Sequence, residues 1–493
     1  MIKKIKSWLF ENRNTRQTVV KNTFWMGVGT IVSRIIKAVV IIYAARVLGA
    51  EKYGVFSYAL SLAAIFSLFA DIGLSAVLTR EMSRNPQSLE KNISTAFGIK
   101  LCLTAASFLL VAGVAPFFSA VKGAASLMPI AAILIAFDSL RDFSASLTRA
   151  WEKMEIEAGI GMATGVGITV FGLLAMWIQP TPFLLMLGYT AGSGLGLLVA
   201  ILLLGKYLKK FWLHFDKELA KTLIKEALPF AVMGLLNALT VNIDAVMIGW
   251  LRSSAEVGLY AAAQRPVLFI YMASSLLASS TFPIVARSAG KDDGRVRTIL
   301  EKTIAISFLA VMPIFVGGAI LAPQLISLLF GAEYAPATAT FATLLFTIIL
   351  VFPVANIING VFAYGEQKIM LYSLIIGGVG NVVFDYLLIR PFGILGSSFA
   401  TIISQTLAYG LLWWKLKQIN NFYTLRHLKK GFVAVAVMGL ATFAMSALQI
   451  HVLINIAVSG LVYFGALIIL KEKLVREAMS VFKMNSVPAT QDV

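Results

Sequence analysis

Several charged side chains lie inside long apolar stretches of this 493-residue chain. The cations are Arg34, Lys37, Lys100, Arg141 and Arg265, and the carboxylates are Asp71, Asp138, Asp142, Asp244 and Asp385. A charge at the centre of a bilayer is costly, and such residues normally face a bundle interior or a wet cavity. They are therefore the candidate functional residues of the protein.

The cations could bind an anionic head group. Arg34 and Lys37 are three residues apart and share one helix face. They lie near the middle of their apolar stretch at about 1.5 Å of rise per residue. Because guanidinium and ammonium groups hold phosphate oxygens, we predict a substrate-binding role for all five cations.

Charge pairing is the alternative for the same residues. Arg141 follows Asp138 by three positions and precedes Asp142 by one, so the three side chains share a region of one helix. Lys100 could also reach the membrane surface with its long side chain. The five carboxylates either pair with cations or bind Na⁺ or a proton, and burial raises a carboxyl pKa as uptake of a proton requires. We expect no other cofactor, no metal centre and no catalytic residue.

The composition identifies the elements that must hold these charges. Hydrophobic residues make up 59% of the chain and charged residues 13%, against roughly 45–50% and about 25% in soluble domains. This excludes a soluble enzyme, a disordered chain and a secreted disulfide scaffold. The single cysteine, Cys102, cannot form an intrachain disulfide or a zinc site. The chain is predicted to be an all-α polytopic membrane protein.

Apolar runs bounded by charge or turn residues predict fourteen transmembrane helices, arranged as two pseudo-symmetric six-helix bundles plus two C-terminal helices. The predicted organisation is a basic, amphipathic cytoplasmic N-terminus (1–21), an N-lobe (22–205), a cytoplasmic linker (206–226), a C-lobe (227–416), a loop with the last two helices (417–470) and a cytoplasmic tail (471–493).

The distribution of positive charge supports this arrangement. Of the 42 Lys and Arg residues, 32 fall in segments predicted to be cytoplasmic when the N-terminus is placed inside, and 5 fall on the opposite side. Positive residues favour cytoplasmic loops. The net charge of +18 is therefore a topology signal, and a nucleic-acid partner is not expected.

The segments outside the apolar runs are short and carry little chemistry. The three histidines, His214, His427 and His451, are far apart, and no Walker A motif is present. A membrane glycosyltransferase, ligase or polymerase normally needs a longer polar loop. We therefore expect the work of the protein to be done inside the membrane, without covalent chemistry.

A weak internal repeat relates the two predicted lobes. At an offset of 204 positions, Gly54 corresponds to Gly258, Phe56 to Tyr260 and Ala59 to Ala263. Both segments open the second helix of a six-helix half. Transporters are often built from two such halves.

Three segments carry a resemblance to a known family. They are Lys21-Asn22-Thr23-Phe24-Trp25, the run Ala44 to Gly54 (AARVLGAEKYG) and Phe69-Ala70-Asp71-Ile72-Gly73-Leu74. Over about residues 20–150 the chain resembles polysaccharide-biosynthesis membrane proteins, the lipid-linked oligosaccharide flippases of the multidrug/oligosaccharidyl-lipid/polysaccharide exporter superfamily. The resemblance implies two six-helix lobes around a central cavity and alternating access that carries a polyprenyl-linked glycan outward.

The expected function is therefore flipping of polyprenyl-(pyro)phosphate-linked oligosaccharide or polysaccharide repeat units across the cytoplasmic membrane, as in O-antigen or exopolysaccharide export. A cation-coupled multidrug exporter of the same fold is one alternative. A membrane glycan polymerase or ligase, or a scaffold without transport, is another. Expected partners are the lipid-linked glycan, membrane lipids, and a glycan polymerase and glycosyltransferases. Both termini are expected in the cytoplasm.

Overall fold

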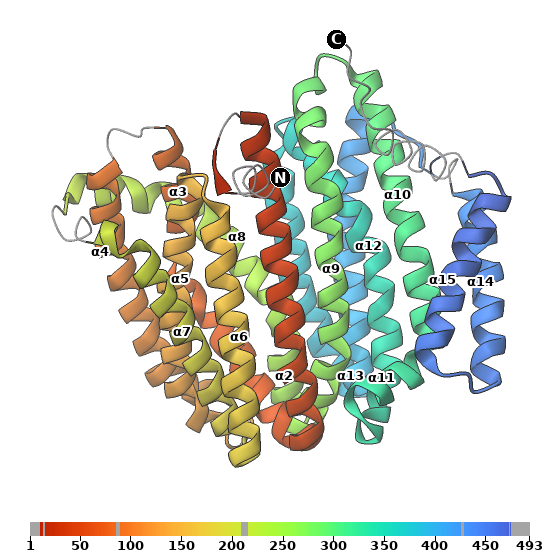
Figure 1. Ribbon diagram of the computed structural model, residues 1–493, viewed down its shortest axis with the longest axis horizontal. Coiled ribbons are helices and arrows are strands. Elements are labelled where there is room, and N and C mark those ends of the chain that lie inside the picture. Colours follow the sequence, from red (N-terminus) through yellow and green to blue (C-terminus); the bar gives the residue numbers. More distant parts are fainter. Residues whose placement is uncertain are drawn as a thin grey trace, which may run out of the picture. The chain divides into compact units, whose positions relative to one another are not determined.

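The structure, a computed structural model, describes residues 10–12, 15–84, 89–208, 215–424, 428–472 and 474. Within these residues every regular element is a helix, and no strand occurs (Figure 1). The all-α polytopic membrane architecture is thus confirmed. Of the predicted N-terminal segment (1–21), residues 15–21 form the start of a long helix, and residues 1–9, 13 and 14 lie outside the described residues, as does most of the predicted tail (471–493).

The α-helices are α2 (Thr15–Phe66), α3 (Leu74–Arg84), α4 (Leu89–Leu109), α5 (Met128–Ala150), α6 (Met154–Ile178), α7 (Pro182–Leu208), α8 (Lys217–Leu251), α9 (Ser254–Ser288), α10 (Asp293–Ile320), α11 (Ala322–Phe330), α12 (Thr338–Ala363), α13 (Gln367–Asn420), α14 (Lys429–Ala447) and α15 (Val452–Ile469). Shorter turns are η1 (Ser67–Ala70), η3 (Leu110–Val114), η4 (Ala115–Phe118), η5 (Ala125–Leu127) and η7 (Ala332–Ala337).

Each predicted apolar span falls on helix, but the helices divide differently. Among the described residues nine helices are long and apolar enough to cross a membrane, or ten with one bent pair. Two long helices each contain a kink, at Gly49 in α2 and Gly393 in α13. One predicted span ends before each kink (22–47 and 369–389), and another begins after it (55–79 and 395–416). The helix α5 holds the charged residues Asp138, Arg141 and Asp142 within its length and is not among these nine. Fourteen spans therefore stays a prediction.

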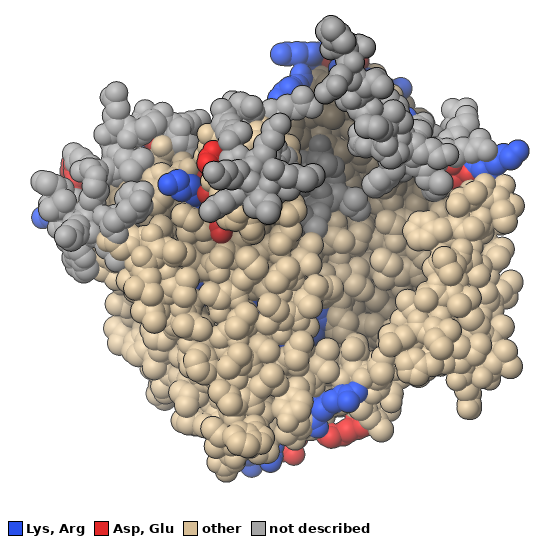
Figure 2. All heavy atoms as spheres, viewed as in Figure 1, with Lys and Arg blue, Asp and Glu red and all other residues tan. Residues whose placement is uncertain are grey.

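Apolar side chains cover the outer surfaces of the helices. In the face drawn in Figure 2, uncharged residues cover the middle of the helices, and Lys, Arg, Asp and Glu gather mainly near helix ends. Many large hydrophobic residues are exposed, among them Leu202, Leu440 and Ile469. Such a surface suits the hydrocarbon of a bilayer, because lipid tails solvate it as well as a protein core does.

Two compact units make up the chain. One contains the residues up to Ala261 together with Asp385–Ile394, and the other contains Ala262–Phe384 and the residues from Leu395 onward. In the first unit, α6 packs along α7 and α2. In the second, α10 packs on α12, and the pair α14 and α15 docks on α10, where Tyr463 Oη donates to the Leu309 carbonyl at 2.7 Å.

Glycines set the closest helix packing in the first unit. A Cβ on Gly192 in α7 would lie 2.2 Å from the backbone nitrogen of Ile168 in α6, and one on Gly188 would lie 2.8 Å from the Phe171 carbonyl oxygen. The spacing of Gly188 and Gly192 therefore serves close packing of α6 and α7, because only glycine lets two backbones approach this closely.

The internal repeat has a structural counterpart in the first unit. A Cβ on Gly54 would lie 1.7 Å from the Ser254 carbonyl oxygen, and one on Gly258 would lie 1.9 Å from the Ala50 carbonyl oxygen. Ser254 corresponds to Ala50 at the same offset of 204 that relates the two glycines. The contact is therefore reciprocal between corresponding positions of the two repeats.

A break in the helical path follows η1. Ile72 and Gly73 have positive φ angles of 40° and 81°. A Cβ on Gly73 would lie 2.3 Å from Cβ of Phe230 in α8, so glycine suits both the backbone conformation and the close packing. Asp71 lies immediately before this break.

Candidate functional site

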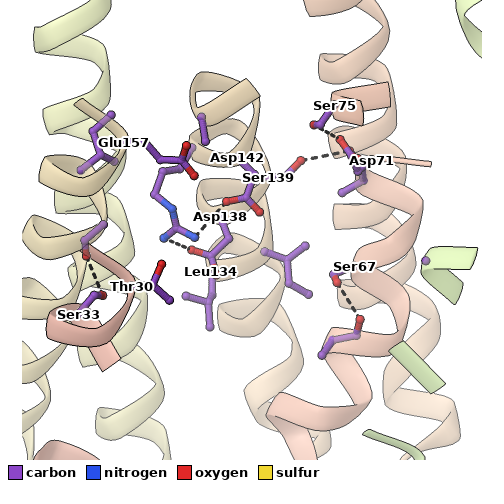
Figure 3. A pocket seen from close by; sticks show the side chains of 18 of the residues that line it. Thr30, Ser33, Ser67, Asp71, Ser75, Leu134, Asp138, Ser139, Asp142 and Glu157 are labelled. Carbon is purple, nitrogen blue, oxygen red and sulfur yellow. Dashed lines mark hydrogen bonds and ion pairs between the residues drawn. The ribbon is translucent and has the colours of Figure 1, made fainter. Parts of the chain in front are cut away.

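A cavity of about 810 Å³ lies within the first unit. Its wall comes from α2, η1, α3, α4, α5, α6 and α8. Among the residues predicted from the sequence, those that line it are Arg34, Lys37, Asp71, Lys100, Asp138, Arg141 and Asp142. Figure 3 shows Asp138, Ser139 and Asp142 on one helix, between Ser33 on one side and Asp71 on the other. Cavities of about 300–1,000 Å³ are of a size for small ligands or head groups.

Lys100 and Asp71 form an ion pair at the edge of the helix break. Lys100 Nζ lies 2.6 Å from Asp71 Oδ1, and the lysine side chain is fully buried. Ser75 Oγ donates to the same carboxylate oxygen at 2.6 Å. Ser139 in α5 donates to the Ala70 carbonyl at 3.1 Å, which satisfies a backbone group near the break.

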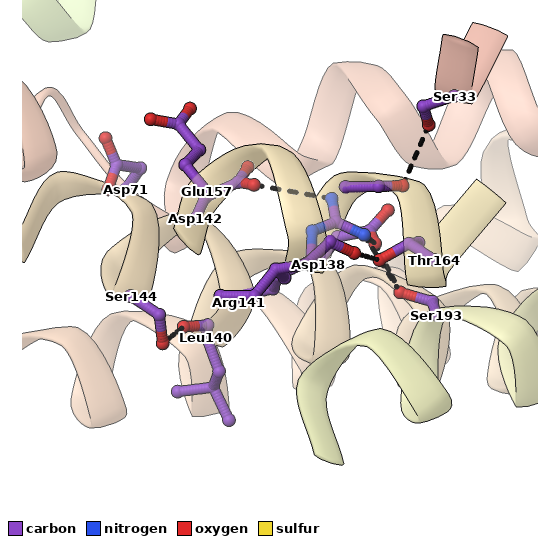
Figure 4. A network of polar contacts seen from close by, with 12 residues as sticks. Ser33, Asp71, Asp138, Leu140, Arg141, Asp142, Ser144, Glu157, Thr164 and Ser193 are labelled. Atoms are coloured by element: carbon purple, nitrogen blue, oxygen red, sulfur yellow. Dashed lines mark hydrogen bonds and ion pairs between the residues drawn. The ribbon is translucent and has the colours of Figure 1, made fainter. Parts of the chain in front are cut away.

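Arg141 is shared between two carboxylates of its own helix. Its guanidinium lies 2.7 Å from Asp138 Oδ1 and 3.3 Å from Asp142 Oδ1. Ser193 in α7 also donates to Asp138 Oδ1, so α5 and α7 are joined at this point (Figure 4). The spacing of three residues in a helix brings Asp138 and Arg141 together, as the sequence predicted.

A third ion pair on the cavity wall was missed by the sequence analysis. Arg149 Nε lies 3.1 and 2.9 Å from the two carboxylate oxygens of Glu157, with a second contact from Nη2. Both residues lie at predicted span ends, where a charge is not unusual. Their spacing across the α5–α6 turn was the only available signal. The hydroxyl residues Thr30, Ser33 and Ser67 of the wall were also missed, because such residues are common in membrane helices.

Arg34 and Lys37 differ from the other cations of the cavity. Within the part of the chain that the structure describes, neither makes an ion pair or a side-chain hydrogen bond, whereas Lys100, Arg141 and Arg149 all do. Both lie on α2, and the Lys37 ammonium interacts electrostatically with Arg141, Asp138, Arg34 and Asp142. These two side chains are therefore available to an anionic ligand.

Three predicted residues lie elsewhere. Arg265 belongs to the second unit, and its Nε is buried with no hydrogen-bond partner among the described residues. Asp244 is buried and accepts a hydrogen bond from Tyr260 Oη. Asp385 is fully buried. None of the three lines the cavity described above.

No group of three or more His, Cys, Asp or Glu side chains among the described residues is arranged to hold a metal ion. The cavity wall offers groups that can bind an anionic ligand. Two cations make no ion pair among the described residues, three cations are paired with carboxylates, and several serine and threonine hydroxyls also line the wall.

The chain is similar to proteins of glycan export. It is 24% identical over 374 residues to the probable low-salt glycan biosynthesis flippase Agl15 of Haloferax volcanii, covering 74% of this chain and 76% of that protein. It is 21% identical over 423 residues to a putative O-antigen transporter of Shigella flexneri, covering 82% and 99%.

The fold is similar to that of solved transporters. A structure of the lipid II flippase MurJ in an inward closed conformation matches with a TM-score of 0.75 at 18% identity, covering 91% of this chain and 99% of that chain. Residues 229–387 match the MatE family. Residues 19–289 match the family described as polysaccharide biosynthesis protein. This last match covers more than half of the chain, and the chain therefore belongs to the polysaccharide biosynthesis protein family.

Proposed function

We propose that this protein is a flippase that moves polyprenyl-(pyro)phosphate-linked oligosaccharide or polysaccharide repeat units across the cytoplasmic membrane. The observation that carries the proposal is the pair of available cations, Arg34 and Lys37, on a cavity within apolar helices. A phosphate cannot cross hydrocarbon without compensation of its charge. The lipid tail of such a substrate can stay in the bilayer while its head occupies the cavity.

The relatives support a transport function without covalent chemistry. The proteins named above are a flippase, an O-antigen transporter and, by fold, a lipid II flippase. In our proposal two lobes, 22–205 and 227–416, alternate access to the two sides of the membrane, with both termini in the cytoplasm. Glycosyltransferases would supply the substrate, and a glycan polymerase would receive it.

Different roles follow for the cations. Arg34 and Lys37 would contact the phosphate directly. Lys100 and Arg141, proposed from the sequence as substrate ligands, would act after a carboxylate releases them, because each is held by one in the structure. Arg265 would contact the substrate from the second lobe. Asp71, Asp244 and Asp385 are the candidates for coupling to Na⁺ or a proton.

A cation-coupled multidrug exporter is the second candidate, and the MatE match over residues 229–387 favours it. Such an exporter binds cationic or apolar drugs, so that Arg34 and Lys37 would contribute little. The two functions therefore differ in what a substitution of these residues does.

The test is a flipping assay in proteoliposomes with a fluorescent polyprenyl-diphosphate oligosaccharide. Arg34→Ala and Lys37→Ala should each lower the flipping rate by roughly 10-fold or more, because a hydrogen bond to a charged group contributes about 1.5–3 kcal/mol. Lys122→Ala removes an exposed cation outside the cavity and should leave the rate unchanged. Wild-type rates in both α2 variants, with a cationic dye exported normally, would favour the exporter.

A further inference from the structure

The carboxylates of the cavity are unequally neutralised. Asp71 is paired with Lys100, and both carboxylate oxygens of Glu157 contact the Arg149 guanidinium. Asp138 and Asp142 share one guanidinium, that of Arg141, so this cluster keeps one net negative charge. The side chain of Asp142 is 64% exposed, and that of Asp138 is 41% exposed.

The cavity is thus bipolar. Two cations without an ion pair among the described residues, Arg34 and Lys37, lie on α2, and α5 carries two carboxylates against one guanidinium. The two regions are close enough to interact, since the electrostatic neighbours of Lys37 include Asp138 and Asp142. In Figure 4, Asp142 and Asp138 lie on the same helix, and the dashed lines join both to the Arg141 guanidinium.

We propose that Asp142, with Asp138, selects the sugar next to the phosphate of the substrate. This inference rests on the proposed function. When the phosphate occupies Arg34 and Lys37, the adjoining sugar would lie against the α5 carboxylates. A carboxylate accepts hydrogen bonds from sugar hydroxyls and attracts an amino group. It repels a sugar that bears its own carboxylate. The preferred substrates are therefore glycans whose first sugar is neutral or carries an amino group, and uronic acids at that position are rejected.

The opposite arrangement would serve acidic glycans. A cavity with cations on both walls would bind phosphate and a uronic acid equally well, and Asp142 would be superfluous. The balance on α5 is negative because one arginine, Arg141, pairs with two acids, Asp138 three residues before it and Asp142 directly after it. This is a repulsive element of the kind that specific sites use against a wrong ligand.

The experiment compares two labelled substrates on the same polyprenyl diphosphate, one with an N-acetylhexosamine as first sugar and one with a hexuronic acid. We expect wild-type protein in proteoliposomes to flip the first at least about 10-fold faster. Asp142→Asn should narrow the preference by about 3-fold or more, and Asp142→Lys should narrow it further or reverse it. Glu218→Gln removes an exposed carboxylate at the start of α8 and serves as the matched control.

The outcomes separate the two proposals. Equal wild-type rates for both substrates, or an unchanged preference in Asp142→Asn and Asp142→Lys, overturn the role of Asp142 and leave the flippase function intact. Failure of wild-type protein to flip either substrate overturns the flippase function itself. Because the preference is a ratio measured on one preparation, a partial loss of folded variant does not change it.

Discussion

At the scale of single residues, the pairing of charges decides what each cation can do. Lys100 is fully buried and 2.6 Å from Asp71, so its charge is compensated inside the protein. Arg34 and Lys37 have no such partner among the described residues. Both kinds of cation occur in one cavity, and only the second kind is free to bind a ligand.

Breaking the buried pair should therefore destabilise the protein. Asp71→Ala leaves the Lys100 ammonium buried without a counter-charge, and we expect a loss of about 3–5 kcal/mol in the free energy of unfolding. Lys100→Met should cost less, because Asp71 is partly exposed and keeps its hydrogen bond from Ser75. The double variant should recover much of the loss. Thermal unfolding in detergent measures the stability of the two single variants and the double variant. If the loss in the double variant equals the sum of the two single losses, the pairing of Asp71 with Lys100 is contradicted.

At the scale of helices, close approaches and broken paths shape the first unit. The reciprocal contact of Gly54 and Gly258 joins the start of the second helix in each repeat. The break at Ile72 and Gly73 places Asp71 beside the cavity. Irregular backbone within a membrane protein is tolerated where it is buried in protein or lines a cavity. The break therefore lies at the candidate site, whereas neither Gly54 nor Gly258 lines the cavity.

Filling either glycine of the reciprocal contact should force the helices apart. We expect Gly54→Ala and Gly258→Ala each to lower the free energy of unfolding by about 1–3 kcal/mol. Gly159→Ala in α6 is the matched control, since a Cβ there meets nothing within 4 Å. It should be neutral or stabilise by about 0.5–1 kcal/mol. The same thermal unfolding measurement compares the three variants. Equal changes in stability at all three positions would contradict a packing role for Gly54 and Gly258.

In the second unit, a polar cluster joins three helix ends. Tyr364, which caps α12, donates to Asp293 Oδ1 at 2.7 Å and accepts from Asn420 Nδ2 at 2.6 Å. Burial, together with the neighbouring Asp293 carboxylate, raises the pKa of Tyr364 to about 12. The folded state therefore favours the neutral phenol.

This raised pKa predicts a pH dependence of stability. The contribution of Tyr364 is fully present below the unfolded pKa of about 10 and is lost as pH rises toward the folded value. Tyr364→Phe should lose less stability between pH 10 and about 12 than the wild type does. The exposed Tyr372→Phe should follow the wild-type curve. Parallel curves for wild type and Tyr364→Phe would contradict the prediction.

At the scale of the whole molecule, positive charge predicts orientation in the membrane. The loops that hold most Lys and Arg residues are expected in the cytoplasm. Lys122 and Lys291 are both exposed. With the N-terminus inside, the fourteen predicted spans place Lys122 in an outside loop and Lys291 in a cytoplasmic loop. They can report the orientation directly.

Cysteine labelling checks this topology. In a Cys102→Ser background, Lys122→Cys should react with a membrane-impermeant maleimide in intact cells. Lys291→Cys should react only after the cells are permeabilised. The reverse pattern would place the termini outside, and reaction of both in intact cells would require a different number of spans between them.

The sequence alone determined the helical membrane fold, the orientation signal and the identity of most charged residues of the candidate site. These follow from composition and from the cost of charge in hydrocarbon, which act locally along the chain. Arg141 could be matched with Asp138 from spacing, because both lie on one helix.

Only the tertiary structure decided which charges remain available. The partner of Lys100 is 29 residues away, and that of Arg149 lies across a turn between helices. The reciprocal glycine contact joins segments 204 residues apart. Pairings of this kind depend on which helices are neighbours and how closely they pack, and neither is encoded in the periodicity of a single helix.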